Sequence, residues 1–318
     1  MTVYGRRRRR ALLGAVLALV LAYMAFAAAR HPLSDQSRAS ASALRWPQQG
    51  QAALALGNGR PAASPDEQPV AIASLAKVMT AYLILERYPL SDMQDGFTIT
   101  VSASQAQAAA QDHAEGQSVV PVGPGEQLTE RELLEALLIP SGNNVAGMLA
   151  VQAAGSEPRF VAEMNAEARA LGMDRTTYTD PSGFDPSTVS TAADQLRVFR
   201  AAMRFSTFRQ IVSMASVTLP IAGTLTNFNP LVADGYAGKT GSDSAAGGCL
   251  AFFTRVTIGG RRQTAAGVVT GQGQGSDTSA LLAAAGQAAE QLVDSVAPKI
   301  ALAQDRDASH RDSIHQRG

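Results

Sequence analysis

The chain has 318 residues, 46% of them hydrophobic, so it holds enough apolar material for a folded core. Its formal net charge is zero and no basic body stands out, which argues against a nucleic-acid-binding protein. A single cysteine, Cys249, excludes an internal disulfide and any cysteine-rich metal cluster. Of four histidines only His113 falls in the expected folded body, so a histidine triad or a zinc centre lacks ligands.

The amino terminus has the pattern of a membrane anchor. Arginines occupy residues 6–10, and an uncharged apolar run follows over residues 11–29. As a helix this run is about 30 Å long, the thickness of a bilayer core. The arginines favour a cytoplasmic amino terminus, so the rest of the chain is expected outside the cell membrane. Small residues at Ala25-Phe26-Ala27 leave a cleaved signal peptide, and hence secretion, as the alternative for residues 1–30.

The remaining chain divides into a linker at residues 31–50, a folded domain at residues 51–296 and a polar tail at residues 297–318 that we expect to be disordered. The domain is predicted to begin with a hairpin that opens at residues 51–56 and turns at Gly57-Asn58-Gly59, followed by a helix over 74–88 and an irregular region with a short helix over 101–127. Four helices are predicted next, over 129–138, from Pro140 through 150, over 159–171 and over 192–205. A hairpin of strands 250–258 and 263–270 and a helix over 279–293 complete the domain. Strands at both ends enclose a helix-rich middle. This order predicts an α+β fold, with an antiparallel sheet flanked by helices and a helix-rich subdomain.

Lysine is scarce in this chain. Three lysines occur against twenty-four arginines, and two of them, Lys77 and Lys239, lie in short motifs with serine, threonine and glycine. Arginine stays protonated, whereas a buried lysine can lose its proton and act as a base, or serve as a compact charge. Because arginine supplies charge elsewhere in the chain, we interpret Lys77 and Lys239 as chemically functional.

Ser74 and Lys77 are three residues apart at the start of a predicted helix, so their side chains share a face. A neutral lysine amine can accept the proton of a serine hydroxyl and so activate it as a nucleophile. Burial and the positive charge of Lys239 would both lower the pKa of Lys77. A serine at a helix start with a surface lysine one turn later is common, so this pair alone is weak evidence.

A second motif, Ser141-Gly142-Asn143, follows the predicted apolar helix and Pro140. Its hydroxyl can pass a proton to a leaving amine, and its amide can bind a substrate carbonyl. By itself the motif also fits an ordinary turn that starts a helix.

A third motif, Lys239-Thr240-Gly241, comes just before a predicted strand and is expected at a strand edge. There an extended peptide can pair with the backbone, while the ammonium and the hydroxyl hold a carboxylate. Gly241 allows the substrate to approach closely. A turn with a solvated lysine is the plain alternative, but the order Ser-x-x-Lys, Ser-x-Asn, Lys-Thr-Gly is specific to class A β-lactamases and penicillin-binding proteins.

The chain resembles the low-molecular-mass penicillin-binding proteins, specifically the serine-type D-alanyl-D-alanine carboxypeptidases of the β-lactamase/transpeptidase-like superfamily. The likeness extends from about Gln51 to about Thr270 and includes IASLAKVMTAY at 72–82, LLEALLIPSGNN at 133–144, DPSGF at 180–184, STAAD at 190–194 and the stretch 238–250. Two departures are Ala73, where proline is common, and Phe184, where leucine is usual.

The resemblance implies an extracytoplasmic catalytic domain that trims the terminal D-alanine from peptidoglycan stem peptides and is inhibited by β-lactams. Its partners would be those peptides, β-lactams and, through the amino-terminal helix, the cytoplasmic membrane. No nucleic acid, metal or organic cofactor is implied. The implied roles are nucleophile for Ser74, general base for Lys77, proton relay for Ser141, amide contact for Asn143, carboxylate binding for Lys239 and Thr240, close substrate approach at Gly241, and an oxyanion hole from the backbone N–H groups of Ser74 and Ser242.

Three alternatives stay open at this point. A D,D-endopeptidase would have the same motifs. A class A-like β-lactamase would need a glutamate to activate water, and neither Glu163 nor Glu167 fits the expected Glu-x-x-Leu-Asn pattern. A catalytically silent penicillin-binding module is the third possibility, although the motif residues are intact.

Overall fold

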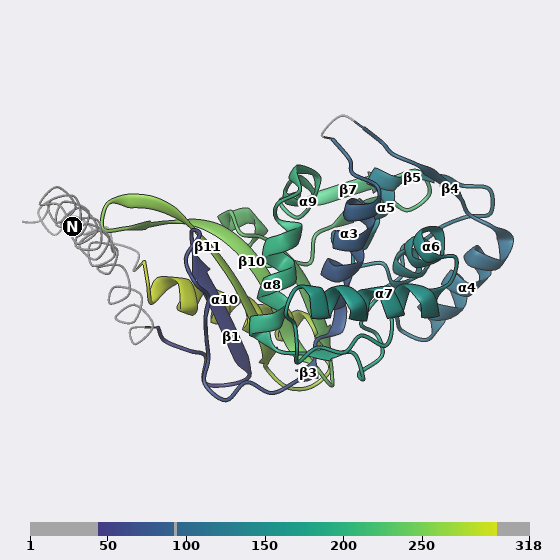
Figure 1. Cartoon of the computed structure of the whole chain (residues 1–318). Coiled ribbons are helices and arrows are strands. Elements are labelled where there is room, and N and C mark those ends of the chain that lie inside the picture. The colour runs from purple at the N-terminus through teal and green to yellow at the C-terminus, as the bar shows by residue number, and fades with distance from the viewer. Residues whose placement is uncertain (1–43, 92–93, 298–318) are drawn as a thin grey trace, which may run out of the picture. The chain divides into compact units, whose positions relative to one another are not determined.

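The computed structural model describes residues 44–91 and 94–297, and those from Arg45 onward belong to one unit (Figure 1). The predicted anchor or signal at residues 1–30, most of the linker at 31–50 and nearly all of the tail at 297–318 lie outside the described residues. Within the described part of the chain, no helix is both long and apolar enough to cross a membrane.

A five-stranded antiparallel sheet forms one layer of the fold, in the order β2, β1, β11, β10, β9. Its strands are β1 (Gln51–Leu56), β2 (Ala62–Ala63), β9 (Ala237–Asp243), β10 (Gly247–Ile258) and β11 (Arg261–Gln272). The two long strands are joined at Gly259-Gly260, where both residues have positive φ, and they form the hairpin that the sequence predicts. Within this sheet β9 pairs only with β10, and its other edge has no strand partner beyond Gly238, whose N–H donates to the Val212 carbonyl at 3.0 Å.

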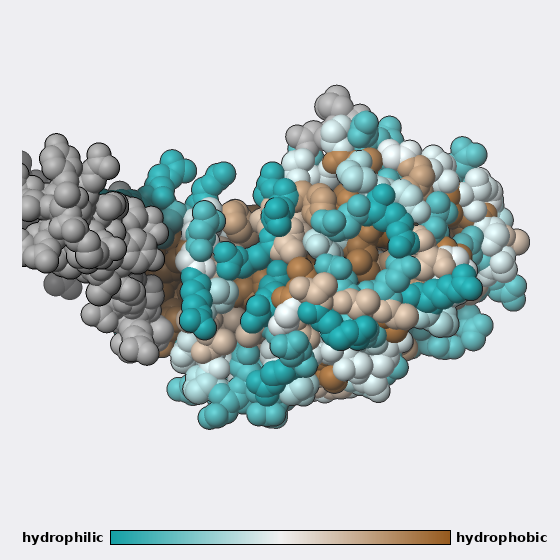
Figure 2. All heavy atoms as spheres, viewed as in Figure 1, coloured by the Kyte–Doolittle hydropathy of each residue, from teal (hydrophilic) through white to brown (hydrophobic). Residues whose placement is uncertain are grey.

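Two helices cover opposite faces of the sheet. Successive residues of a strand point to opposite sides, so each helix packs on alternate residues of the strands. α8 (Ala192–Ala202) lies on the face of Phe253 and Ala266, and α10 (Thr278–Asp294) lies against the face of Gly248 and Phe252. In Figure 1 α8 stands in front of the sheet and α10 behind it. Figure 2 shows hydrophilic side chains over the exposed side of α8, as expected of a helix that buries only its apolar side.

The helical part of the fold is built around α3 (Ala76–Arg87), in which nine of twelve residues are buried. It follows a short 3-10 turn, η1 (Ala73–Leu75), and packs against α5 (Glu130–Leu138), α6 (Asn143–Ala154), α7 (Glu157–Ala170) and α8. A helix with apolar residues on every side is stable only inside a core. The antiparallel sheet and its flanking helices confirm the predicted fold class for the described residues.

One helix is longer than predicted. The polar region after Val101 contains α4 (Ala103–Ala114), twelve residues long, where the sequence suggested an irregular region with a short helix. Ser102 and Gln105 form a capping box at its start, as Thr129 and Glu132 do at the start of α5. Only the second capping box was used in the prediction, although both satisfy free N–H groups at a helix start in the same way.

Other elements also differ from the prediction. The Lys-Thr-Gly motif lies inside β9 rather than before a strand. The helix expected over 192–205 ends at Ala202, and a new one, α9 (Ser206–Ile211), follows. Small two-stranded ribbons were not predicted: β3 (Val70–Ala71) with β6 (Val189–Ser190), β4 (Thr98–Thr100) with β5 (Gln127–Thr129), and β7 (Ser216–Leu219) with β8 (Gly223–Thr226); a 3-10 turn, η2 (Val232–Asp234), precedes β9.

Gly183 brings a loop close to the turn that starts α3. A Cβ at Gly183, which has φ +79°, would lie 1.9 Å from the carbonyl oxygen of Ala73. Ala73 itself has φ +44°, a conformation that costs an L-residue about 1–2 kcal/mol. The close packing therefore holds the residue before Ser74 in a conformation that it would not adopt alone.

Gly183→Ala should destabilise the protein more than Gly235→Ala, a matched control with φ +80° and no atom near a new Cβ. Both changes put a Cβ at positive φ, at a cost of about 1 kcal/mol. Only the first also collides with backbone, so we expect an added loss of about 1–3 kcal/mol. Chemical denaturation of both variants measures this difference, and equal losses would contradict the packing argument.

Glu130→Gln should stabilise the protein above pH 7. Glu130 is 1% exposed, and its Oε1 has no hydrogen-bond partner among the described residues. Burial raises the pKa of its carboxyl from 4.5 to about 7. The folded protein therefore loses stability as the pH rises from about 4.5 to 7, because only the unfolded chain releases the proton freely.

The expected gain at pH 8 is about 1–3 kcal/mol in the free energy of unfolding, with little gain at pH 4.5. Denaturant titrations at the two pH values check it, with the exposed Glu115→Gln as control. A gain that is the same at both pH values would show that the charge of Glu130 is not responsible.

Candidate active site

Ser74 and Lys77 form the centre of the site. Ser74 lies in η1 and Lys77 in the first turn of α3, and the Lys77 Nζ is 2.7 Å from the Ser74 Oγ. Lys77 also donates to Asn143 Oδ1 at 2.7 Å and to the Ser182 carbonyl at 3.0 Å. The amine is thus held by oxygens from three separate parts of the chain, one of which is the serine hydroxyl.

Burial determines the charge of Lys77. Its side chain is completely buried, and all three hydrogen-bond partners are uncharged. Burial first, and then the charge of Lys239, hold the pKa of Lys77 well below its ordinary value, while Asp180 acts weakly in the opposite direction. A lysine with a lowered pKa offers a free amine as a base near neutral pH.

Ser141 and Lys239 form a second pair. The Lys239 Nζ donates to Ser141 Oγ at 2.9 Å and to the Thr240 carbonyl at 2.8 Å. Lys239 is also fully buried, and burial lowers its pKa to about 7. Ser141 sits between α5 and α6 with φ +65°, so its hydroxyl is presented from a sharp turn.

The open edge of the sheet passes beside the serine. Lys239, Thr240, Gly241 and Ser242 are consecutive residues of β9, the edge strand next to β10. A Cβ at Gly241 would lie 3.0 Å from the Ser74 backbone nitrogen, so glycine allows the strand to approach the first turn of η1. An extended peptide that paired with β9 would therefore pass in front of Ser74.

The structure brings every predicted site residue to one groove. Its cavity volume is about 310 Å³, and its lining includes Ser74, Ser141, Asn143, Thr240, Gly241 and Ser242. Lys77 and Lys239 lie beneath this surface and bond to Ser74 and Ser141. Two partly exposed aromatic rings, Phe184 and Phe228, also line the groove.

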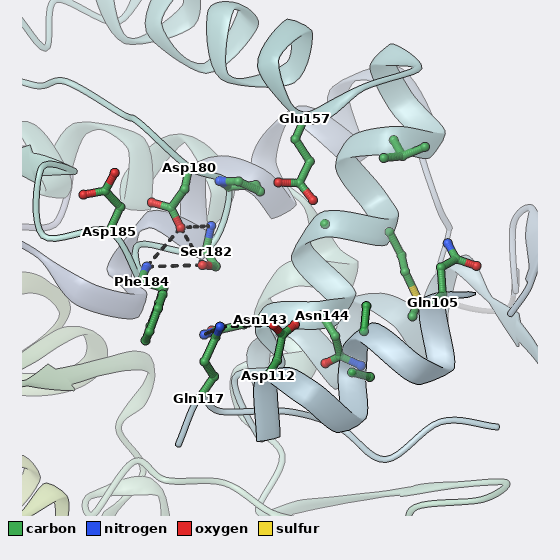
Figure 3. Close-up of a pocket in the computed structure, with 16 residues that line it drawn as sticks. Gln105, Asp112, Gln117, Asn143, Asn144, Glu157, Asp180, Ser182, Phe184 and Asp185 are labelled. Atoms are coloured by element: carbon green, nitrogen blue, oxygen red, sulfur yellow. Dashed lines mark hydrogen bonds between the residues drawn. The ribbon is translucent and has the colours of Figure 1, made fainter. Parts of the chain in front are cut away.

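A second pocket of about 390 Å³ adjoins the groove and shares Gln117, Asn143 and Phe184 with it (Figure 3). Four carboxylates line this pocket, namely Asp112, Glu157, Asp180 and Asp185. Burial raises the pKa of Glu157, and the charges of Asp180 and Asp112 add to this effect. Among the described residues, no group of three or more histidine, cysteine, aspartate or glutamate side chains is placed to hold a metal ion.

The loop that contacts Lys77 had no predicted role. Asp180 accepts hydrogen bonds from the Ser182 N–H at 3.1 Å, the Ser182 hydroxyl at 2.5 Å and the Phe184 N–H at 3.0 Å (Figure 3). Thr80 donates to the Pro181 carbonyl at 2.6 Å. These bonds fix the Ser182 carbonyl that accepts from Lys77. The DPSGF match to the family was the available signal, but it did not reveal which atom would be used.

Comparison with known proteins agrees with this geometry. Residues 62–271 match the sequence profile of the peptidase S11 family, D-alanyl-D-alanine carboxypeptidase. The D-alanyl-D-alanine carboxypeptidase DacB2 of Mycobacterium tuberculosis is 35% identical over 199 residues, which are 60% of this chain and 63% of that protein. A D-alanyl-D-alanine endopeptidase of Pseudomonas aeruginosa is 30% identical over 197 residues, covering 59% of this chain and 60% of that protein.

Among solved structures, a mutant of the Streptomyces K15 DD-transpeptidase aligns with a TM-score of 0.64 and 25% identity, over 76% of this chain and 96% of that one. The curated relatives are matched over only about three fifths of their own length. The family profile nevertheless spans most of the described residues and includes all three motifs. The chain therefore belongs to the S11 family of serine peptidases, the D-alanyl-D-alanine carboxypeptidase family.

Proposed function

We propose that this protein is a serine D-alanyl-D-alanine carboxypeptidase that removes the terminal D-alanine from peptidoglycan stem peptides through an acyl-enzyme. One observation carries the proposal: a buried lysine amine lies 2.7 Å from a serine hydroxyl in a groove bordered by an open strand edge. Membership of the S11 family supports the same reaction.

Acylation begins at Ser74. The Lys77 amine takes the hydroxyl proton while Oγ attacks the carbonyl carbon of the penultimate D-alanine. The backbone N–H groups of Ser74 and Ser242 stabilise the negative oxygen that forms. The two backbone segments approach each other because residue 241 is glycine.

The leaving group is handled by the second pair. Ser141 passes a proton to the departing amine, and Lys239 with Thr240 binds the terminal carboxylate. Release of D-alanine leaves an ester on Ser74, which water then hydrolyses. A β-lactam that resembles the D-alanyl-D-alanine end would acylate the same hydroxyl.

An endopeptidase is the second candidate, favoured by similarity to the Pseudomonas aeruginosa endopeptidase. Two substrates separate the possibilities: D-alanine release from a pentapeptide indicates a carboxypeptidase, and cleavage of a cross-linked dimer indicates an endopeptidase. For a β-lactamase, nitrocefin hydrolysis is the test. Glu163 pairs with Arg87 and Glu167 accepts from Tyr82, and neither glutamate lines the groove, which disfavours them as activators of water.

We also propose that the domain acts outside the cytoplasmic membrane and is held there by residues 11–29, with secretion after signal cleavage as the alternative. Support comes from the five arginines before the apolar run. The mass of the amino-terminal peptide of protein isolated from its own membranes separates the two. An intact peptide means an anchor, and a terminus near residue 28 means cleavage.

Penicillin should form a covalent adduct with the purified full-length protein, because the activated Ser74 hydroxyl attacks the strained lactam carbonyl. Intact-mass spectrometry should show one added penicillin for the wild type and for Ser213→Ala, a control at an exposed serine. Ser74→Ala should show none. A wild-type mass that stays constant through prolonged incubation would refute the catalytic proposal.

Substrate recognition should weaken as the pH rises through about 7. Lys239 binds a carboxylate only when charged, and burial lowers its pKa to about 7 in the free protein. We expect kcat/KM for a peptide ending in a free carboxylate to fall above this pH relative to the same peptide ending in an amide. Dividing kcat/KM for the carboxylate peptide by kcat/KM for the amide peptide removes the effect of Lys77 titration in the free protein, because both peptides share it. A ratio that does not change between pH 6 and 9 would exclude Lys239 as the carboxylate partner.

A further inference from the structure

A chain of side-chain hydrogen bonds leads away from the site to a carboxylate. Asn143, whose Oδ1 accepts from Lys77, donates through Nδ2 to Gln117 Oε1 at 2.9 Å. Gln117 in turn donates through Nε2 to Asp112 Oδ1 at 3.2 Å. Figure 3 shows these three residues close together at one wall of the second pocket, with Asp112 coming from α4 and Asn143 from the start of α6.

The carboxylate sets the direction of the whole chain. An amide can donate or accept at either end after a half-turn of its head, whereas an ionised carboxylate only accepts. Asp112 therefore requires the NH₂ group of Gln117, which leaves Gln117 Oε1 facing Asn143. That oxygen requires the NH₂ group of Asn143, so Asn143 must present its own oxygen to Lys77.

This direction matters for the base. A neutral lysine amine has two N–H groups and one lone pair. The Ser182 carbonyl and Asn143 Oδ1 are both acceptors and take the two N–H groups. The lone pair is then left for the Ser74 hydroxyl, 2.7 Å away. A reversed Asn143 would offer an N–H to that lone pair and compete with Ser74 for it.

We propose that Asp112 and Gln117 are positioning residues that fix the Asn143 amide and thereby direct the Lys77 lone pair at Ser74. The proposal rests on the proposed function, since it concerns the same site. In the step itself the Ser74 proton moves to Lys77, the Oγ–carbon bond forms, and the carbonyl electron pair moves to oxygen. The other charges that act on Lys77, Lys239 and Asp180, are the same in every variant below.

The first test compares acylation by a fluorescent penicillin in three variants. Gln117→Leu removes both bonds, and we expect the acylation rate constant to fall about tenfold to a hundredfold, less than the loss of the general base itself because Lys77 is still present. The double variant Asp112→Asn with Gln117→Glu exchanges amide and carboxylate at constant net charge. In it the new amide at position 112 donates, the new carboxylate at position 117 accepts from Asn143, and the direction is kept.

The double variant should recover most of the wild-type rate at its own pH optimum, which shifts upward because the carboxylate is nearer to Lys77. Gln111→Leu is the matched control. Gln111 lies beside Asp112 in α4 and donates to Glu115 at 3.1 Å, but it has no link to the site. It should acylate like the wild type. Full activity of Gln117→Leu, or no recovery in the double variant, would overturn the proposal.

A second readout does not require penicillin. With only three lysines in the chain, ¹³Cε-lysine labelling gives three signals, so the titration of Lys77 can be followed directly. In Gln117→Leu the Asn143 amide is free to turn its oxygen away from Lys77. This removes an acceptor that stabilises the ammonium, so the Lys77 midpoint should move to lower pH. An unchanged midpoint would overturn the positioning role of Asp112 and Gln117. This readout holds even if the wild type formed no penicillin adduct and the proposed function had failed on its own test.

Discussion

Two lysine side chains are buried in one site, and neither bonds to a carboxylate of the described residues. Lys77 is held by a hydroxyl, an amide oxygen and a backbone carbonyl, and Lys239 by a hydroxyl and a backbone carbonyl. A buried charge without a counter-ion costs several kcal/mol, so burial lowers the pKa of both amines, that of Lys239 to about 7. Arginine could not do this, because its guanidinium stays charged. The activity proposed for Ser74 depends on these uncharged surroundings.

Such a site requires backbone that is held rigidly from outside. Ala73, the residue before Ser74, and Ser141 both have positive φ without being glycine. The almost fully buried α3 and the paired strand β9 supply the packing that stabilises these turns. Beside Ser74, a Cβ at Gly183 would lie 1.9 Å from the Ala73 carbonyl oxygen, and a Cβ at Gly241 would lie 3.0 Å from the Ser74 nitrogen. Strain at the turns and small residues beside them are therefore parts of one arrangement.

The sequence predicts the parts of this arrangement that depend on local pattern. The central helix, the long hairpin and the capping box at Thr129 follow from periodicity and from short-range hydrogen bonds. The shared groove could be expected because three motifs occur in a specific order. By contrast, the DPSGF match did not reveal the role of the Ser182 carbonyl, and Gln117 lies in no motif. Each is placed by contacts between segments far apart in the chain, which local sequence does not encode.

The two lysines are also coupled through space, and under the proposed function this coupling would give the substrate a part in its own activation. Burial lowers the pKa of Lys77 most, and the charge of Lys239 lowers it further. A carboxylate that binds beside Lys239 would cancel much of that charge at short range. The pKa of Lys77 would then rise once substrate is bound, and a base of higher pKa takes the Ser74 proton more readily. A fixed carboxylate of the protein beside the two lysines could not replace the substrate carboxylate in this effect. Such a group would favour protonated amines throughout the cycle, and not only when substrate is bound.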